Sequence, residues 1–458
     1  MASTSNPGLR RELGLVQATA LAITDMIGIG PFITTPLFLA TMGGPQAMLG
    51  WLVGAGLAFC DGLVWAELGA AMPKAGGSYN YLREAFGPAT AGRWFSFLVV
   101  WQIMFSAPLS VASGSIGFAN YFHYLVPGLS PWGLRIFASL IPLVMILLLY
   151  RRIRALGNLS VVLLVGVLIG CFWIVGSGLP QLSAQRIFDF PPGAFRLNWL
   201  FWAGLGHATL FALYDYFGYY NVCYLGEEIR DPGRVIPRAI LFSIVAVAAL
   251  YILMNASMLS VVPWREAQQS KFIASTYMER LYGVGAGNVM TVLMLWIAFS
   301  SVFSVLLGYT RIPYAAAADG NFFRVFARLH PKGDFPHVSL VTLGLIASAF
   351  SLLNLPEVIG GLVAIRVMNQ YLPQAIGFFV LRFRRPDLPR PFRMWLYPLP
   401  GLAIIFGWLY VLATATPRSL ILAVAVFLVG TVAFLVRAGL RREWPFVDSR
   451  QKAEGGRQ

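Results

Sequence analysis

Charged residues are scarce in this chain of 458 residues. Asp, Glu, Lys and Arg make up 12% of it, whereas apolar residues make up 58% and the mean hydropathy is +0.69. A soluble protein needs more charged side chains to cover its surface, and a disordered chain has far fewer apolar ones. The composition therefore excludes both classes and predicts that lipid surrounds most of the chain.

Cysteine and histidine are also rare, with three and four residues respectively. Cys60, Cys171 and Cys223 all lie in apolar stretches, where a free thiol packs as a small hydrophobic group. The sequence contains no His-Glu-x-x-His helix, nucleophile elbow or Gly-x-x-x-x-Gly-Lys-Ser/Thr phosphate loop. We therefore expect no disulfide framework, no bound metal cluster or cofactor and no catalytic residues, which argues against an intramembrane enzyme.

Long uncharged apolar stretches recur along the whole chain. About 20 residues of helix are needed to cross a bilayer. The amphipathic helices that would cover a large soluble core are missing. The sequence therefore predicts an all-α integral membrane protein with twelve transmembrane helices. The predicted spans are residues 14–42, 46–71, 94–122, 136–150, 155–185, 197–226, 239–263, 281–310, 338–354, 358–381, 396–416 and 419–436.

The net charge of +15 follows a topological pattern. Of the 34 Lys and Arg residues, 26 lie in the terminal segments and alternate connections on one side, seven lie on the other side, and Arg366 lies within a span. Basic residues mark the cytoplasmic side of a membrane protein. We therefore expect the N-terminus (1–13) and the tail (439–458) to be cytoplasmic, in a plasma (inner) membrane, and no nucleic-acid partner.

Four charged residues lie inside predicted spans, namely Asp25, Asp61, Asp215 and Arg366. A charge at mid-bilayer costs about 2.5 to 3.5 kcal/mol, so these residues are candidates for proton coupling. Asp61 either is a proton relay or forms a structural hydrogen bond to the backbone of the first span. Arg366 is either the internal partner of one of the acids or a side chain that reaches toward the interface.

The first and sixth predicted spans are both interrupted. Gly28-Ile29-Gly30-Pro31-Phe32 breaks the first, because glycine relaxes the backbone and proline lacks an N–H. Residues 213–220 break the sixth with a glycine among tyrosines. Matching breaks predict two inverted five-helix repeats, residues 14–185 and 186–395, followed by two further helices in 396–438. The alternative is that Gly28 and Gly30 only let helices pack closely.

The chain resembles the amino acid, polyamine and organocation transporter superfamily at motifs spread over residues 15–395. The broken first span is similar to the Gly-x-Gly-Ile-Phe element of that family. The other matching motifs are Ala66-Glu67-Leu68-Gly69, Pro73-Lys74-Ala75-Gly76-Gly77-Ser78-Tyr79, Tyr81-Leu82-Arg83-Glu84-Ala85-Phe86-Gly87, Glu227-Glu228-Ile229-Arg230-Asp231-Pro232, Ile236-Pro237-Arg238-Ala239, residues 311–320, Leu329-His330-Pro331 and residues 384–393.

This resemblance implies a leucine-transporter-like fold that works by alternating access. Spans 1, 2, 6 and 7 would rock against spans 3, 4, 8 and 9. The family binds a substrate carboxylate at the backbone amides of the first break and the substrate amine at carbonyl groups of spans 1 and 6. On this chain the implied binding residues are Asp25, Gly28, Ile29, Gly30, Tyr214, Asp215, Tyr216, Phe217 and Gly218.

Two departures from the family pattern concern this site. Pro31 replaces an aliphatic residue and removes one amide donor, as in plant polyamine uptake relatives. Span 5 lacks the lysine that several proton-coupled members carry, because residues 157–176 contain no cation.

The function that these residues predict is secondary active transport of amino acids, with a preference for cationic ones and with protons as the coupling ion. Asp25 and Asp215 in a box of aromatic residues suit an ammonium group. The alternative is a polyamine or organic cation carrier, and a passive channel is less favoured. The box is formed by Tyr214, Tyr216, Phe217 and Tyr219, with Trp101, Phe105 and Trp296 as further candidates.

Three weaker candidates remain. Ser300, Ser301 and Ser304 could supply hydroxyl groups to a sodium ion, although membrane serines usually bond to their own backbone. Glu227, Glu228 and Arg230 are candidates for ion pairs of an inner gate, the alternative being a solvated charge run. His207 is expected to be a packed residue rather than a titrating one. The sequence does not predict an oligomeric state.

Overall fold

The computed structural model describes residues 13–74, 76–150, 156–331 and 335–446. Every regular element in these ranges is a helix, and the one strand-like contact is a parallel bridge between Leu13 and Ile229. The all-α prediction is therefore confirmed. Most of the predicted cytoplasmic termini lies outside the described residues. The same holds for nine of the basic residues used in the topology argument, namely Arg10, Arg11, Arg151, Arg152, Arg154, Lys332, Arg450, Lys452 and Arg457.

The helices coincide with the predicted apolar stretches, with short additional helices in the connections. The first half contains α1 (Leu15–Met26), α2 (Gly30–Met42), η1 (Pro45–Met48), α3 (Leu49–Ala71), α4 (Ser78–Phe86), α5 (Ala91–Leu125), α6 (Pro131–Leu149), α7 (Leu156–Gly178), η3 (Leu179–Gln181) and α8 (Ala184–Ile187). The second half contains α9 (Trp199–Tyr216), η4 (Tyr219–Glu228), α10 (Pro232–Val261), α11 (Trp264–Ala267), α12 (Ile273–Tyr282), α13 (Val284–Tyr309), α14 (Arg311–Ala318), η5 (Arg324–Ala327), α15 (His337–Phe350), α16 (Leu355–Arg366), η6 (Val367–Tyr371), α17 (Leu372–Arg384), α18 (Leu399–Thr414) and α19 (Pro417–Arg441).

Several helices begin where the sequence provides a cap. Ser130, Asn198 and Thr416 each accept a hydrogen bond from the amide three residues later, at the starts of α6, α9 and α19. Proline follows the cap in α6 and α19, where its missing N–H has no intrahelical partner to lose. Polar caps followed by apolar runs therefore set these helix starts.

Length and apolar composition allow six or seven spans in the described residues. The broken pair α1 and α2, bent by 49°, gives the seventh. Three shorter apolar helices, Val165–Gln181, His337–Phe350 and Leu399–Thr414, contain 10 to 17 residues. The predicted number of twelve spans and the inverted repeat remain predictions. The six helices are Pro45–Ala71, Ala91–Leu125, Pro131–Leu149, Pro232–Val261, Val284–Ala318 and Pro417–Arg441.

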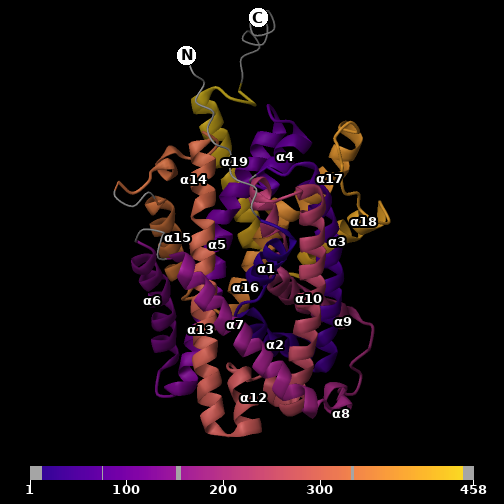
Figure 1. Ribbon diagram of the computed structural model, residues 1–458, viewed down its shortest axis with the longest axis vertical. Helices are drawn as coiled ribbons and strands as arrows, with labels where there is room; N and C mark the ends of the chain where they lie inside the picture. The colour runs from indigo at the N-terminus through magenta and orange to yellow at the C-terminus, as the bar shows by residue number, and fades with distance from the viewer. Residues whose placement is uncertain (1–12, 75, 151–155, 332–334, 447–458) are drawn as a thin grey trace, which may run out of the picture.

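The long helices pack in two groups, and α1 and α2 lie near the centre of the view in Figure 1. In one group, α3 packs against α9 and α10, while α1 packs on α10 and α2 on α9. In the other group, α5 packs against α6, α13 and α15. Gly50 and Gly54 bring α3 close to α9, because a Cβ at either position would lie within 2.6 Å of an alanine Cβ on α9.

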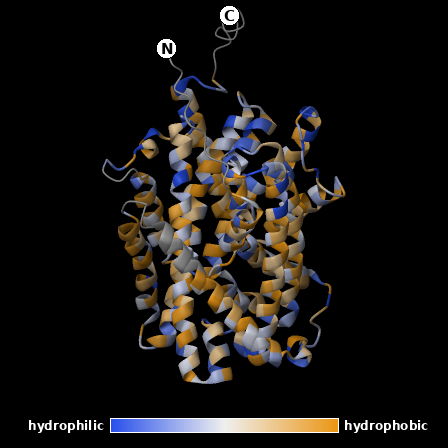
Figure 2. Cartoon of the chain, in the orientation of Figure 1, coloured by the Kyte–Doolittle hydropathy of each residue, from blue (hydrophilic) through white to orange (hydrophobic). Residues whose placement is uncertain are grey.

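Hydrophilic residues gather at the ends of the molecule, and apolar residues dominate between them (Figure 2). Helices α4 and α14 lie at one end, and α8 and α12 lie at the other (Figure 1). The C-terminal end of α19 is held near α14, because Arg441 donates a hydrogen bond of 2.7 Å to the carbonyl oxygen of Gly320. The end of the twelfth predicted span and the connection after the eighth therefore meet at the same end of the bundle.

The segment after α17 is fixed to α3 and α4 at this end. Glu67, on α3, is 1% exposed and forms ion pairs with Arg382 at 2.5 Å and Arg390 at 3.3 Å. Its Oε2 atom also accepts a hydrogen bond from the amide of Met394 at 2.7 Å. One buried carboxylate therefore joins the end of α3 to three points of the segment that follows span 10.

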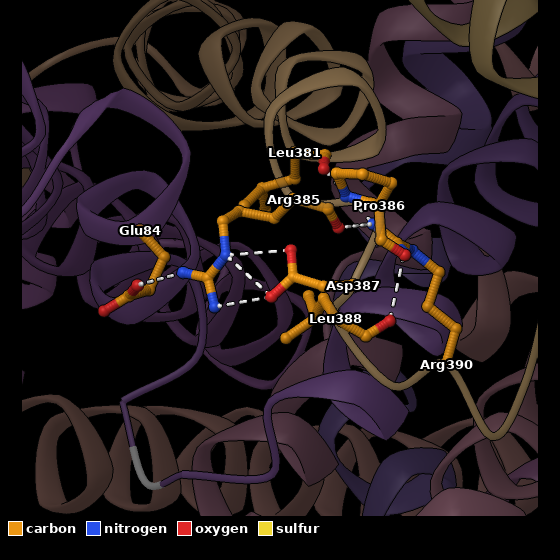
Figure 3. Close-up of polar contacts among 7 residues, drawn as sticks. All are labelled: Glu84, Leu381, Arg385, Pro386, Asp387, Leu388 and Arg390. Carbon is orange, nitrogen blue, oxygen red and sulfur yellow. Dashed lines mark hydrogen bonds and ion pairs between the residues drawn. The ribbon is translucent and has the colours of Figure 1, made fainter.

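A second, exposed cluster lies beside it (Figure 3). Arg385 lies between Glu84 of α4, at 3.9 Å, and Asp387, at 3.3 Å. Arg390 donates hydrogen bonds to the carbonyl oxygens of Leu388 at 3.0 Å and Arg385 at 2.9 Å. The hydrogen bond from Arg385 lowers the pKa of the Asp387 carboxyl. The turn after α17 is thus closed by arginine side chains.

The tenth predicted span contains one irregular turn. Immediately after Arg366, residues Val367–Tyr371 form a π-helical turn, and α17 then continues. A π turn accommodates an additional residue within a helix and is frequent at functional sites. The apolar pattern of residues 358–381 predicts a continuous helix and gives no sign of this turn.

Candidate functional site

The first break separates α1 from α2 at residues 27–29. Ile27 is extended, with ψ of 106°, while Ile29 returns to helical angles before Gly30 begins α2. Pro31 does not lie in the break as predicted. It occupies the first turn of α2, where proline is tolerated because the amide it lacks has no partner in the helix.

The second break lies at Phe217 and Gly218 and touches the first. Helix α9 ends at Tyr216, Gly218 has a φ of +133°, and a 3-10 helix follows. A Cβ at Gly218 would lie 2.7 Å from the carbonyl carbon of Asp25 and 2.9 Å from the amide nitrogen of Met26. Only glycine permits both the angle and this approach of two backbones. The two interrupted helices therefore meet, as predicted.

A cavity of about 670 Å³ opens where the breaks meet. Its wall includes most of the predicted binding residues. At one end it is lined by Tyr79 and Asn80 of α4 and by Arg311 of α14 and Asp319. Predicted residues that line it are Asp25, Gly28, Ile29, Gly30, Tyr214, Asp215, Phe217, Gly218, Ser300, Ser301, Ser304 and Arg366.

Few backbone amides are available at the first break. The amide of Ile29 donates to Ser301 Oγ at 3.2 Å, and that of Phe32 donates to the carbonyl oxygen of Ile29 at 3.1 Å. Pro31 has no amide proton. Within the described residues, no partner is recorded for the amides of Gly28 and Gly30. The predicted carboxylate cradle is therefore reduced to two amides, and Ile29 is not one of them.

The two acids of the site have different surroundings. Asp25 is exposed to the cavity and accepts a hydrogen bond from Asn221 Nδ2 at 3.1 Å. Asp215 is 3% exposed, and its Oδ2 atom accepts a hydrogen bond from Thr34 Oγ1 at 2.6 Å. Its Oδ1 atom is buried without a recorded partner and faces Gly30. Asp25 is therefore open to a ligand, and Asp215 stands behind the second half of the broken helix.

Asp61 lies away from this cavity. It is 1% exposed, and its Oδ2 atom accepts a hydrogen bond of 2.6 Å from the hydroxyl group of Tyr219. It is not among the described residues that line the cavity. Among the described residues no hydrogen bond between Asp61 and the backbone of the first span is recorded, and the recorded partner is Tyr219, which follows the second break. The predicted role as a proton relay remains a prediction.

Arg366 lines the cavity but is not paired with an acid. It donates hydrogen bonds to the hydroxyl groups of Tyr220 at 3.1 Å and Tyr309 at 2.9 Å. Its guanidinium also lies over the rings of Phe217 and Tyr309, at 5.5 and 5.4 Å. No ion pair of Arg366 with a carboxylate is recorded among the described residues. The prediction that it pairs with an intramembrane acid is therefore corrected: tyrosines hold it.

The aromatic wall differs from the predicted box. Tyr214 and Phe217 line the cavity, and the Tyr214 hydroxyl group hydrogen-bonds with Ser113 Oγ at 2.7 Å. Tyr216 points away, because its hydroxyl group donates to the carbonyl oxygen of Trp51 at 3.4 Å. The structure adds Tyr220, Tyr224 and Tyr309 to the wall. Predicted aromatic residues that are outside the described lining are Tyr216, Tyr219, Trp101, Phe105 and Trp296.

The structure shows some contacts of the serine and inner-gate candidates. Ser301 Oγ already accepts the Ile29 amide, while Ser300 and Ser304 also line the cavity. At the candidate inner gate, the backbone of Glu228 and Arg230 pairs with Leu13, at 3.0 and 2.9 Å. This bridge ties the chain before α1 to the end of η4. The proposed ion pairs of Glu227, Glu228 and Arg230 remain a prediction. His207 is not among the described lining residues.

Several residues that shape the site were not predicted. Tyr251 donates to the carbonyl oxygen of Met26 at 2.7 Å, and Tyr121 donates to that of Phe32 at 3.2 Å, so both hold the broken backbone. Thr34, Ser113 and Asn221 hold the side chains of Asp215, Tyr214 and Asp25. All five are polar side chains that lie close to the breaks or within apolar spans, and this is the feature of the sequence by which they could have been predicted.

The fold and cavity define an integral membrane protein built from helices, with a polar site between two broken ones. A family model described as "Amino acid permease" matches residues 13–436. The serine/threonine exchanger SteT of Bacillus subtilis is 26% identical over 450 residues, covering 96% of this chain and 99% of the relative. The branched-chain amino acid permease BcaP of the same organism is 25% identical over 431 residues, covering 88% of each. Human Asc-type amino acid transporter 1 is 28% identical over 419 residues, covering 88% of this chain and 77% of the relative.

The chain belongs to the amino acid permease family, within the amino acid, polyamine and organocation superfamily. The resemblance inferred from the motifs is therefore confirmed. The family and these relatives are transporters, so the protein is a transporter and not an enzyme.

Proposed function

We propose that this permease is a secondary active transporter of amino acids, with a preference for cationic ones and with protons as the coupling ion. The observation that carries the proposal is the cavity of about 670 Å³ at the contact between the two breaks, with Asp25 exposed inside it. The relatives named above are amino acid transporters, which supports amino acids as the substrate class. The proposed binding residues are Asp25, Gly28, Gly30, Tyr214, Asp215, Phe217 and Gly218, with Ile29 contributing its side chain.

Asp25 is the proposed ligand of the substrate ammonium group. It lies in the last turn of α1, where the carbonyl end of the helix carries partial negative charge that favours a cation. Aromatic residues Tyr214, Phe217 and Tyr220 line the same cavity, and ring faces attract ammonium groups. The carboxylate, the helix end and the aromatic rings therefore all favour the binding of a cation.

Proton coupling is proposed at Asp215. Its Oδ1 atom is buried without a recorded partner, while Oδ2 accepts the hydroxyl group of Thr34. A carboxyl group in such a place is able to gain and lose a proton as the site opens to each side. Asp61, bonded to Tyr219 of the second break, is the second candidate.

The packing of the helices into two groups supports a mechanism of alternating access. We propose twelve spans, with inverted repeats in residues 14–185 and 186–395 and two helices in 396–438. The group of α1, α2, α3, α9 and α10 would move against the group of α5, α6, α13 and α15. Helices α4 and α14, which both follow spans at the predicted cytoplasmic side, line one end of the cavity.

The substitution Asp25→Asn tests the ammonium site. We expect uptake of a cationic amino acid to fall by about 100-fold, because a charged group loses its buried partner at a cost of about 2 to 5 kcal/mol. Uptake is measured in proteoliposomes with the amount of inserted protein held equal. Asp387→Asn, at the exposed turn after α17, is the matched control and should transport normally. Unchanged kinetics of Asp25→Asn would remove Asp25 from the site.

The substitution Pro31→Ala tests whether the number of free backbone amides at the first break limits carboxylate binding. Alanine restores an N–H in the first turn of α2, beside the two amides of Gly28 and Gly30. One added hydrogen bond to a charged group is worth about 1.5 to 3 kcal/mol. We therefore expect at least about tenfold tighter binding of an amino acid, with little change for the corresponding amine lacking the carboxylate. Equal changes for both ligands would contradict this assignment.

The same reconstituted protein distinguishes the candidate functions. A labelled basic amino acid is taken up in competition with ornithine and putrescine at two pH values. Strong competition by putrescine alone would favour the second candidate, a polyamine or organic cation carrier, which the missing Pro31 amide supports. Uptake that neither saturates nor shows counterflow would favour a channel. Acceleration by a sodium gradient, without an effect of pH, would replace the proton by sodium.

A further inference from the structure

A buried arginine beside the two breaks forms no recorded ion pair with an acid of the described part of the chain. Arg366 is 5% exposed and lines the cavity. Two tyrosine hydroxyl groups accept hydrogen bonds from its Nη1 and Nη2 atoms, at 3.1 and 2.9 Å. A guanidinium carries five N–H groups in a planar fork, so two such bonds do not use its donor capacity. An arginine held by neutral groups keeps its full charge uncompensated.

The position of Arg366 puts this charge at the binding level of the cavity. Its guanidinium lies 5.5 Å from the ring of Phe217, the residue that begins the second break. The next residue, Gly218, lies against the backbone of Asp25. Arg366 lies over the side chain of Phe217 and the backbone of Asp25 lies against Gly218, so the two residues contact neighbouring positions of the second break.

The backbone at the first break is a poor anion site in this chain. The Ile29 amide is used by Ser301, the Phe32 amide is used by Ile29, and Pro31 has none. A carboxylate bound only by the amides of Gly28 and Gly30 would lack the cation that normally accompanies a buried negative charge. The cation that the cavity offers at this level is Arg366.

We propose that Arg366 binds the α-carboxylate of the substrate. The inference rests on the proposed function and narrows it. A planar guanidinium accepts a carboxylate through two parallel N–H···O bonds, and the tyrosines fix its orientation before the substrate arrives. With Asp25 as the ammonium ligand, the site holds both charged groups of an amino acid. A diamine, which has no carboxylate, would leave Arg366 uncompensated, so the site selects amino acids over polyamines.

The experiment compares ligands that differ only in the carboxylate. Binding of lysine, lysine methyl ester and cadaverine, and of leucine and isopentylamine, is measured with the purified full-length protein in nanodiscs. We expect the wild-type protein to bind each amino acid at least tenfold more tightly than its ester or amine. Arg366→Gln should weaken binding of the amino acids by tenfold or more and leave the amines within about twofold, whereas Arg366→Lys should retain part of the preference.

Several outcomes would overturn this inference. The wild-type comparison needs no variant, and equal affinity for lysine and its methyl ester contradicts a cationic carboxylate site. If the Arg366→Gln substitution weakens the binding of amino acids and of amines equally, the role of Arg366 is structural. If glutamate, measured in the same way, is the only ligand whose binding Arg366→Gln weakens, Arg366 recognises a side-chain carboxylate, which contradicts the inference. Wild-type protein that binds amines but ignores the carboxylate contradicts this inference alone, whereas protein that binds none of these ligands contradicts the proposed function as well.

Discussion

Gly218→Ala is expected to reduce transport by about 100-fold or more. The added Cβ would lie 2.7 to 2.9 Å from backbone atoms of Asp25 and Met26, and the φ of +133° is one that alanine rarely adopts. Neither backbone can give way easily, because Tyr251 holds the carbonyl oxygen of Met26. The two breaks must therefore separate, and a displacement of about 1 Å in a binding site is sufficient for such a loss. Initial uptake rates in proteoliposomes measure the effect.

The matched control for this variant is Gly56→Ala. A Cβ at Gly56, on α3, meets no atom within 4 Å, and its backbone angle is ordinary. This variant should insert and transport like the wild-type protein. If Gly218→Ala transports normally at equal protein levels, the contact between the breaks does not position the substrate.

Glu67→Ala is expected to destabilise the folded protein by about 3 to 5 kcal/mol, because it leaves the charges of Arg382 and Arg390 without their buried partner. The amide of Met394 also loses its acceptor. The turn after α17 should then detach from α3. A lower unfolding temperature in detergent and faster proteolysis after Arg382 or Arg390 measure the change.

Glu84→Gln provides the comparison for Glu67. Glu84 forms its ion pair with Arg385 at 3.9 Å, and both side chains are exposed (Figure 3). Exposed ion pairs contribute about 0 to 1 kcal/mol, so the unfolding temperature should hardly change. Equal effects of the two substitutions would mean that the burial of Glu67 does not matter for stability.

The breaks and most of the cavity wall were predictable because their signals are local. Backbone groups left unpaired at a glycine break and a carboxylate such as Asp25 are both costly in lipid, so each marks a place where the chain must have another environment. The same reasoning placed Pro31 inside the break, although its fixed φ suits the first turn of the following helix. The residue types identified the interrupted region of the first span, whereas the backbone angles at Ile27 and Ile29 show where the break begins and ends.

The partners of the predicted residues were less predictable, because they come from distant helices. Periodicity does not show that Tyr216 turns toward Trp51, or that Tyr219 reaches Asp61. Arg366 is the clearest case. A sequence with three acids in its spans favours an ion pair, whereas packing placed tyrosines around the guanidinium. Such contacts depend on how α9, α13 and α16 pack together.

The π-helical turn at Val367–Tyr371 affects how this permease is compared with its relatives. Because that turn holds one residue more than regular α-helix would, a relative with an uninterrupted tenth span is shorter there by one position. An alignment without a gap then shifts the register and sets Arg366 opposite the wrong neighbour. The equivalent of Arg366 should therefore be sought by superposing structures, with a single-residue gap allowed between 366 and 372.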